Sequence, residues 1–124
     1  MPIQIGFELE FLGDHRVHDR LQRDLKIRLD HYGDHNGRAY KRYFLTTDGS
    51  IEPDYVFIEN EIGHELISPI FPLQKGLKEI KRCFDFLKKY KYETNYTCGF
   101  HVGVSFSNKD DMKKVNLNKL VFLF

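Results

Sequence analysis

The sequence predicts an α+β fold in which an antiparallel or mixed sheet carries its helices on one face. Apolar residues alternate with polar or small ones at residues 3–12 and 101–106, and this period of two is typical of half-buried strands. Apolar residues recur at helical spacing at residues 15–32 and 73–90, as in amphipathic helices. Because the strand pattern is one-sided, we expect helices to cover one face of the sheet.

Length and composition predict one domain over residues 1–124. The chain has 124 residues, of which 41% are hydrophobic, enough for a packed core. Charged residues reach 30% but the formal net charge is only +1, which argues against a nucleic-acid binder. No apolar run approaches the roughly 20 residues of a membrane helix, and two glutamates stand where a secretory signal would be apolar. We therefore expect a soluble cytoplasmic protein whose two cysteines, Cys83 and Cys98, are buried free thiols.

The first half of the chain predicts strands around one helix. After the strand at 3–12, a helix over 15–32 has an apolar stripe with four-residue spacing, formed by Val17, Leu21, Leu25 and Leu29. Further strands are predicted at 42–46, at 62–67 and, as a short edge strand after Pro53, at 55–58. A loop is expected at 33–37 and a turn at 47–50. The pair Ser68-Pro69 should end the strand at 62–67, because a residue before proline avoids the helical region.

The second half predicts a helix, a strand and a last amphipathic segment. The helix over 73–90 should bury Leu77, Ile80, Phe84 and Leu87. The strand at 101–106 follows a loop, and a final amphipathic segment starts near residue 112. Residues 120–124 are all apolar. We expect them to dock into the core, to contact a second copy or another chain, or to be covered by a continuation of the protein.

Three of the strands carry chemistry-bearing side chains. Glu8 and Glu10 are two residues apart on one strand, so they project from the same face about 7 Å apart. Glu65 lies in an otherwise core-like strand, where a lone charge needs a partner or a metal. Each alone has an ordinary explanation, a solvated strand face for the first two and a salt bridge for Glu65.

A histidine and a turn complete the set. His101 heads its strand, and Gly103 points to the same side, which leaves bare backbone where a ligand or a phosphate could approach. A hydrogen-bonded surface histidine is the ordinary alternative. Asp48 and Ser50 lie in a predicted turn and either stabilise it or aim oxygens into a site. Carboxylates and an imidazole from three strands, converging on one face, would suit ATP and Mg²⁺.

These segments together resemble a known family. They are IGFELEF at 5–11, TDGSI at 47–51, HELISPI at 64–70 and TCGFHVGVS at 97–105. In order and spacing they resemble the amidoligase family, which belongs with the glutamine synthetase-like carboxylate–amine ligases. The resemblance spans roughly residues 3–124 and implies the catalytic half of a glutamine synthetase-like fold.

The resemblance also implies roles for particular residues. The expected catalytic and metal-binding residues are Glu8, Glu10, Glu65 and His101. The residues expected beside the nucleotide phosphates are His101, Gly99 and Gly103, and those at the substrate edge are Asp48 and Ser50. Gly103 stands where the family often has a second histidine, and family members usually continue beyond the position of residue 124.

The implied activity is ATP- and Mg²⁺-dependent amide formation. A carboxylate from a small molecule or a peptide would be phosphorylated and then attacked by an amine. Two other functions stay open. One is a truncated, non-catalytic assembly or binding module of the same fold, and the other is a metal-dependent hydrolase that uses the same carboxylates.

Overall fold

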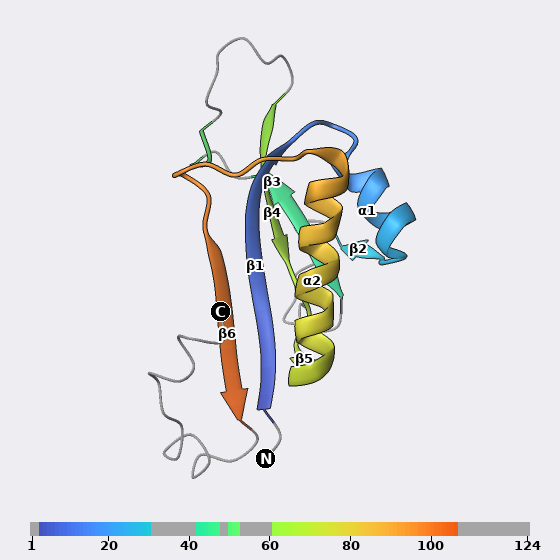
Figure 1. Cartoon of the computed structure of the whole chain (residues 1–124), viewed down its shortest axis with the longest axis vertical. Helices are drawn as coiled ribbons and strands as arrows, with labels where there is room; N and C mark the ends of the chain where they lie inside the picture. The colour runs from blue at the N-terminus through green and yellow to red at the C-terminus, as the bar shows by residue number, and fades with distance from the viewer. Residues whose placement is uncertain (1–2, 31–41, 48–49, 53–60, 107–124) are drawn as a thin grey trace.

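The described part of the chain folds as one sheet with two helices, shown as a computed structural model in Figure 1. The structure describes residues 3–30, 42–47, 50–52 and 61–106. Within them the strands are β1 (Ile3–Gly13), β2 (Leu29–Asp30), β3 (Tyr43–Thr47), β4 (Ile62–Ile67), β5 (Phe71–Pro72) and β6 (Phe100–Phe106). The helices are α1 (Val17–Leu25) and α2 (Leu73–Tyr90).

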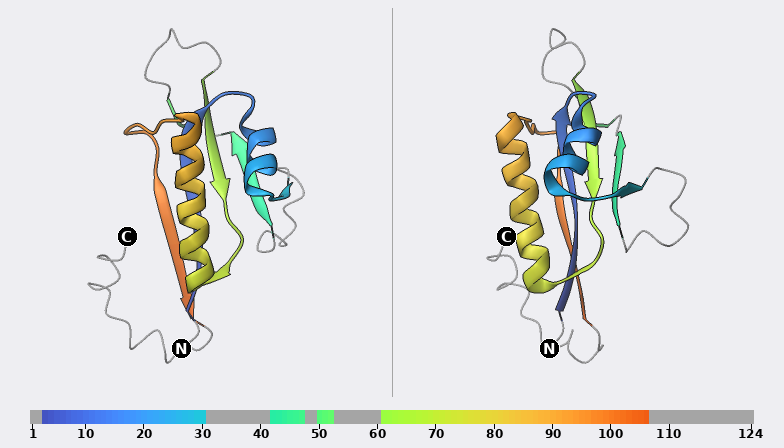
Figure 2. Two further views of the ribbon diagram at one scale, coloured as in Figure 1. Left: turned by 45° about the vertical axis from the view of Figure 1, so that its right-hand side comes forward. Right: turned by 90° about the vertical axis from the view of Figure 1, so that its right-hand side faces the viewer.

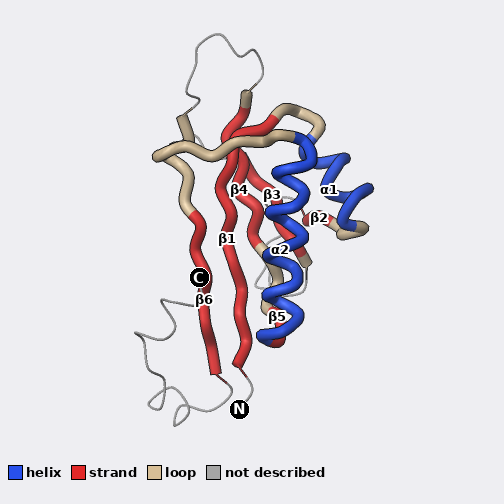
Figure 3. Tube along the Cα trace, in the orientation of Figure 1, coloured by secondary structure: helices blue, strands red, loops and turns tan. Residues whose placement is uncertain are grey.

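The long strand β1 is the centre of the sheet. It pairs antiparallel with β4 and β5 and, over residues 3–9, with β6. Strand β3 extends the sheet beyond β4, and the short strand β2 pairs with β3 in parallel. The sheet is therefore mixed, which confirms the predicted α+β class. The ribbons of β1 and β6, which pair over seven residue positions, lie side by side in Figures 1 and 3.

Both helices pack on the same face of this sheet. Residues of both helices belong to the same core as the odd-numbered residues of β1, and both helices lie in front of the strands in the left view of Figure 2. Strand β1 turns its odd-numbered apolar residues towards them, because successive side chains in a strand point to opposite faces. The shared core consists of Phe7, Leu9, Phe11, Val17, Leu21, Leu25, Leu29, Tyr43, Leu66, Phe71, Cys83, Phe86 and Leu87.

Helix α1 is shorter than the sequence pattern predicted. It ends at Leu25, and Lys26 has a left-handed backbone with φ 53°. Val17, Leu21 and Leu25 are buried as expected, but Leu29 reaches the core from strand β2. The prediction of a helix to residue 32 was wrong because the apolar spacing continues through a turn that no glycine or proline marks.

Helix α2 has the predicted bounds but buries a different stripe. Gly76, Glu79, Cys83, Phe86 and Leu87 are buried. By contrast, Leu77 and Phe84 are about two-fifths exposed, with relative exposures of 37% and 41%. Apart from Leu87, the buried stripe is displaced by one residue from the predicted one.

Two local contacts explain this displacement. Helix α2 comes so close to β1 at Gly76 that a Cβ atom there would lie 2.4 Å from Cγ1 of Ile5. Glu79 tolerates burial because Arg82 pairs with it at 2.6 Å and the Tyr43 hydroxyl donates to it at 3.4 Å. Burial raises the pKa of Tyr43, so its hydroxyl stays protonated and remains a donor.

The remaining predicted elements have mixed outcomes. The strand at 62–67 has the predicted bounds and ends before Ser68-Pro69, and strands β3 and β6 begin within one residue of their predicted starts. The loop at 33–37, the edge strand at 55–58, the Asp48-Gly49 part of the turn and the segment from 112 to 124 lie outside the described residues. In the part of the chain that is described, neither helix has the length and apolar character needed to cross a membrane.

The close approach at Gly76 yields a prediction about stability. Gly76→Ala should lower the free energy of unfolding by up to about 2 kcal/mol, because overpacking a tight contact costs about 1–3 kcal/mol, whereas alanine gains only about 1 kcal/mol in helix propensity. Urea denaturation followed by circular dichroism measures the difference. In an Ile5→Ala background the same substitution should become neutral or stabilising, since the opposing atoms are gone. Stabilisation of the wild-type chain by Gly76→Ala would contradict the close approach.

Buried His64 yields a prediction about pH. Its Nε2 donates to the Asp14 carbonyl at 3.2 Å and its ring stacks on Phe11. Burial lowers the pKa of His64 below its ordinary value of 6.5. The unfolded chain therefore binds the proton more readily, and stability present above about pH 6.5 is lost as the pH falls below it.

The measurement is urea denaturation between pH 7.5 and pH 5. His64→Gln keeps an N–H donor but cannot titrate, so stability should fall less steeply with pH in this variant than in the wild type. His15→Gln removes an exposed histidine and should retain the wild-type slope. Equal slopes for His64→Gln and the wild type would show that the buried imidazole does not control this range.

Candidate functional site

The face of the sheet opposite the helices carries the acidic side chains of β1. Phe7, Leu9 and Phe11 are buried against the helices, so Glu8 and Glu10 project from the other face. Glu8 is half-exposed, with 48% of its side chain accessible, and Glu10 is partly buried. The structure therefore places both glutamates on one face, as their spacing predicted.

Glu65 joins them from the neighbouring strand. In the β1–β4 ladder Glu10 lies directly opposite Glu65, and in the β3–β4 ladder Thr46 lies opposite Glu65. These three residues thus form a row across three strands on the open face. Two carboxylates directly opposite each other destabilise a sheet, and a cation between them would offset that repulsion.

His101 joins the face from the other side of β1. It lies opposite Glu8 in the β1–β6 ladder, and its Nδ1 is 3.6 Å from Glu8 Oε2. Both side chains are substantially exposed, 68% for the histidine, so the contact contributes little to stability. Its significance is positional, since it aligns an imidazole with the strand that carries both glutamates.

Gly99 lies beside Glu10, which faces Glu65, and beside His101, which faces Glu8. Its N–H donates to Glu10 Oε1 at 3.0 Å, and its carbonyl accepts from the Glu10 N–H at 3.0 Å. A Cβ atom on Gly99 would lie 2.9 Å from Glu10 Oε1 and 3.0 Å from Cε1 of His101. A side chain here would displace both groups, so the glycine allows Glu10 and His101 to converge.

Ser68 and Pro69 keep β1 bonded where β4 ends. The Phe7 N–H donates to Ser68 Oγ at 2.8 Å, and the Ser68 hydroxyl donates to the Pro69 carbonyl at 2.7 Å. The Ser68 N–H in turn donates to the Phe7 carbonyl at 2.9 Å. The Phe7 N–H thus keeps a hydrogen-bond partner where the chain departs from the β1–β4 ladder. Glu8 stays in register with the end of β4.

The segment at residues 50–52 is hydrogen bonded to the loop before β6. The Glu52 N–H donates to Thr97 Oγ1 at 2.9 Å, and the Asn95 amide donates to the Glu52 carbonyl at 2.6 Å. Ser50, two residues before Glu52, is exposed, whereas Asp48 lies outside the described residues. The segment that contains Ser50 is therefore tied to the loop that leads to Gly99.

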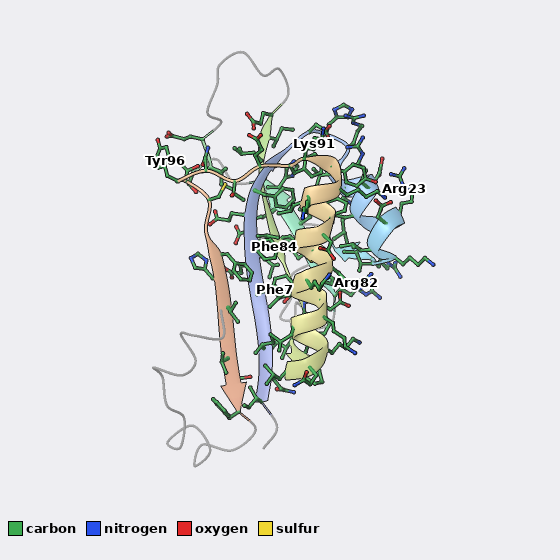
Figure 4. All side chains as sticks on the ribbon, in the orientation of Figure 1. Phe7, Arg23, Arg82, Phe84, Lys91 and Tyr96 are labelled. Carbon is green, nitrogen blue, oxygen red and sulfur yellow. The ribbon has the colours of Figure 1, made fainter. Side chains whose placement is uncertain are left out.

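Sequence reasoning missed the residues that make this junction. Asn95 Oδ1 accepts from the N–H and the hydroxyl of Thr97, at 2.9 and 2.6 Å. The side chain between them, Tyr96, is 88% exposed and extends outwards from the loop in Figure 4. An Asn-x-Thr sequence before a strand is the local signal that could have indicated this turn.

An open hollow adjoins Glu8 and His101 on the same face. It has a volume of about 440 Å³. Gly6 and Gly103 lie opposite each other in its floor, and Ile67 and Ile70 line it as well. The sequence analysis identified Gly103 but not the other three residues. The signal for Gly6 was available, since it alternates with the buried residues of β1 as Gly103 does in β6.

The four predicted metal ligands form two cross-strand pairs, Glu10 with Glu65 and Glu8 with His101. Among the described residues no group of three or more histidine, cysteine, aspartate or glutamate side chains is arranged to hold a metal ion. The oxygen donors of Glu10 and Glu65 nevertheless fit Mg²⁺, which proteins commonly hold through one or two carboxylates together with substrate phosphates.

One of the two thiols lies in the core. Cys83 and Cys98 are both free, as predicted, although Cys98 is only partly buried. Burial raises the pKa of Cys83 to about 12, which suppresses the thiolate form that attacks substrates or binds metals. Cys83 is thus a core residue of helix α2.

Comparison with known proteins identifies the family. No curated protein and no solved structure matches the chain. One family model matches it, described as putative amidoligase enzyme, and the match covers residues 1–123. All of the motifs that form the open face fall within that range, and the chain belongs to this amidoligase family.

Proposed function

We propose that this chain is an ATP- and Mg²⁺-dependent carboxylate–amine ligase that forms an amide through an acyl phosphate. The observation that carries the proposal is the placement of Glu8, Glu10, Glu65 and His101 on one open face, in neighbouring strands of a chain that belongs to the amidoligase family. Amide formation is the activity after which that family is described.

Glu10 and Glu65 would hold the cation. They face each other across adjacent strands, and hard cations prefer carboxylate oxygens. Glu8 and His101 form the neighbouring cross-strand pair on the same face. Bound there, Mg²⁺ would neutralise phosphate charge and align the γ-phosphoryl group of ATP.

The chain itself would contribute position and charge. Gly99 fixes one oxygen of Glu10 through its N–H, so the carboxylate is oriented before a ligand binds. In the overall reaction a substrate carboxylate oxygen bonds to the γ-phosphorus as ADP leaves. The amine nitrogen then bonds to the acyl carbon, the carbon–oxygen bond to phosphate breaks, and the amine gives up a proton.

The substrates would be a small-molecule or peptide carboxylate and an amine. Ser50 would lie at the substrate edge, since its segment is tied to the loop before Gly99. A cytoplasmic setting, where ATP and Mg²⁺ are abundant, suits this activity.

Calorimetric titration of the full chain with Mg²⁺ and ATP tests the site. We expect ATP binding that requires Mg²⁺, with a Kd raised about tenfold or more in Glu10→Gln and in Glu65→Gln, equivalent to about 1.4 kcal/mol or more. Each substitution removes a negative charge and keeps the side-chain shape. The matched control is Glu93→Gln, at an exposed position outside the two pairs, and it should bind as the wild type does.

Two results would contradict the proposal. Mg²⁺–ATP binding that is insensitive to Glu10 and Glu65 would remove the cation from this face, and an absence of nucleotide binding would favour the non-catalytic module.

Nucleotide turnover separates the ligase from a hydrolase. We expect phosphate release from ATP only when a carboxylate and an amine are supplied together, because the acyl phosphate needs both partners to complete the reaction. Coupled phosphate assays with each substrate class alone serve as controls. Steady ATP hydrolysis with water as the sole acceptor would instead indicate a metal-dependent hydrolase.

A further inference from the structure

Two glycines face each other in the middle of the β1–β6 ladder. Gly6 pairs with Gly103, and the register is unbroken from Ile3–Phe106 to Leu9–Phe100. Glycine weakens a strand interior, because it loses more conformational freedom on folding and has no side chain to pack. Two of them at one register position therefore call for a physical explanation.

Within the described residues, packing does not require either glycine. There a Cβ atom on Gly103 would contact the Gly6 carbonyl oxygen at 3.9 Å, and one on Gly6 would make ordinary contacts at 3.6–3.8 Å. The continuous register excludes a bulge at this point. The remaining reason for a mid-strand glycine is the close approach of a ligand or another backbone.

The hollow above these glycines has a definite chemical character. Ile67 and Ile70 supply apolar side chains, Glu8 and His101 contribute polar groups, and Ser105 adds a hydroxyl. No lysine or arginine lines it among the described residues. Glu8 is the only lining residue with a permanent charge at neutral pH, so the hollow favours a cation with an apolar body and disfavours a carboxylate or a free phosphate.

The volume favours a cation larger than ammonium. A water molecule, which is about as large as ammonia, occupies roughly 30 Å³ in the liquid. At about 440 Å³ the hollow is far larger, so it is suited to an organic ammonium. Glu8 is also two residues from Glu10 on β1, which places the cationic end of such a ligand beside the proposed cation site.

We infer that the glycine-floored hollow binds the amine substrate, as an alkylammonium ion with an aliphatic body. This inference rests on the proposed ligase function and gives that function a class of amine. The bare backbone of Gly6 and Gly103 accommodates the aliphatic body, and Glu8 attracts the ammonium group.

The test uses isoamylammonium as a probe of the full chain without metal or nucleotide. Backbone amide signals in NMR spectra of the ¹⁵N-labelled protein should shift for Gly6, His101 and Gly103 at millimolar concentrations of the probe. Isovalerate has the same carbon body with the opposite charge, and it should bind at least fivefold more weakly. Adenosine serves as a planar, uncharged comparison.

Substitutions locate the binding. Gly103→Val fills the hollow and Glu8→Gln removes its charge, and each should weaken isoamylammonium binding at least fivefold. Gln4→Val is the matched control, because Gln4 lies on the same face of β1 two residues from Gly6 and outside the lining. If Gly103→Val fails to give a folded spectrum, Gly6→Ala and Gly103→Ala provide smaller obstructions at the same place and should weaken binding at least twofold.

Three outcomes would overturn the inference. They are unchanged isoamylammonium binding when the hollow is filled, binding of isovalerate as tight as that of the ammonium, and tighter binding of adenosine at the same amides. Glu10→Gln separates this inference from the proposed function, because it should impair Mg²⁺–ATP binding and retain the isoamylammonium shifts at Gly103. If the wild type shows only one of the two, Mg²⁺–ATP binding or the isoamylammonium shifts, the proposal whose binding is absent has failed.

Discussion

The alternation of side chains along β1 is the constraint on which the rest of the structure depends. One strand supplies the buried residues Phe7, Leu9 and Phe11 to the helix-covered face and Glu8 and Glu10 to the open face. A shift of one residue in its pairing would exchange these two sets, burying the carboxylates and exposing the core. The hydrophobic effect therefore fixes the register, and the register in turn fixes which strand positions can meet a ligand.

Residues at the ends of the neighbouring strands adapt this register to the site. Gly99 has no side chain, and its N–H orients Glu10 while the imidazole of His101 comes alongside. Ser68 maintains hydrogen bonding to β1 where Pro69 ends β4. Each residue belongs to a short sequence motif, and the structure gives a backbone reason for the residue type. These motifs thus hold the carboxylates in position, in addition to any direct role that their residues have in chemistry.

Much of the fold was predictable because it follows from local periodicity. The bounds of α2 and β4 and the facing of Glu8 and Glu10 need only the spacing of apolar residues. The early end of α1 at Leu25 and the buried stripe of α2 were not predictable in this way. The first depends on a left-handed Lys26, and the second on Gly76 approaching Ile5 and on Glu79 finding Arg82 and Tyr43. Cross-strand neighbours were equally hidden, since no local pattern states that Glu10 lies opposite Glu65 or Gly6 opposite Gly103.

The open face of the sheet carries two cross-strand arrangements that cost stability, and they are the main physical argument that this face binds ligands. Glu10 is set opposite a second glutamate and Gly6 opposite a second glycine, and both arrangements weaken an isolated sheet. A bound cation would relieve the repulsion between the two glutamates, and a bound organic group would occupy the space above the two glycines. Local choices that oppose stability are expected where function requires them, and here they lie together on one face.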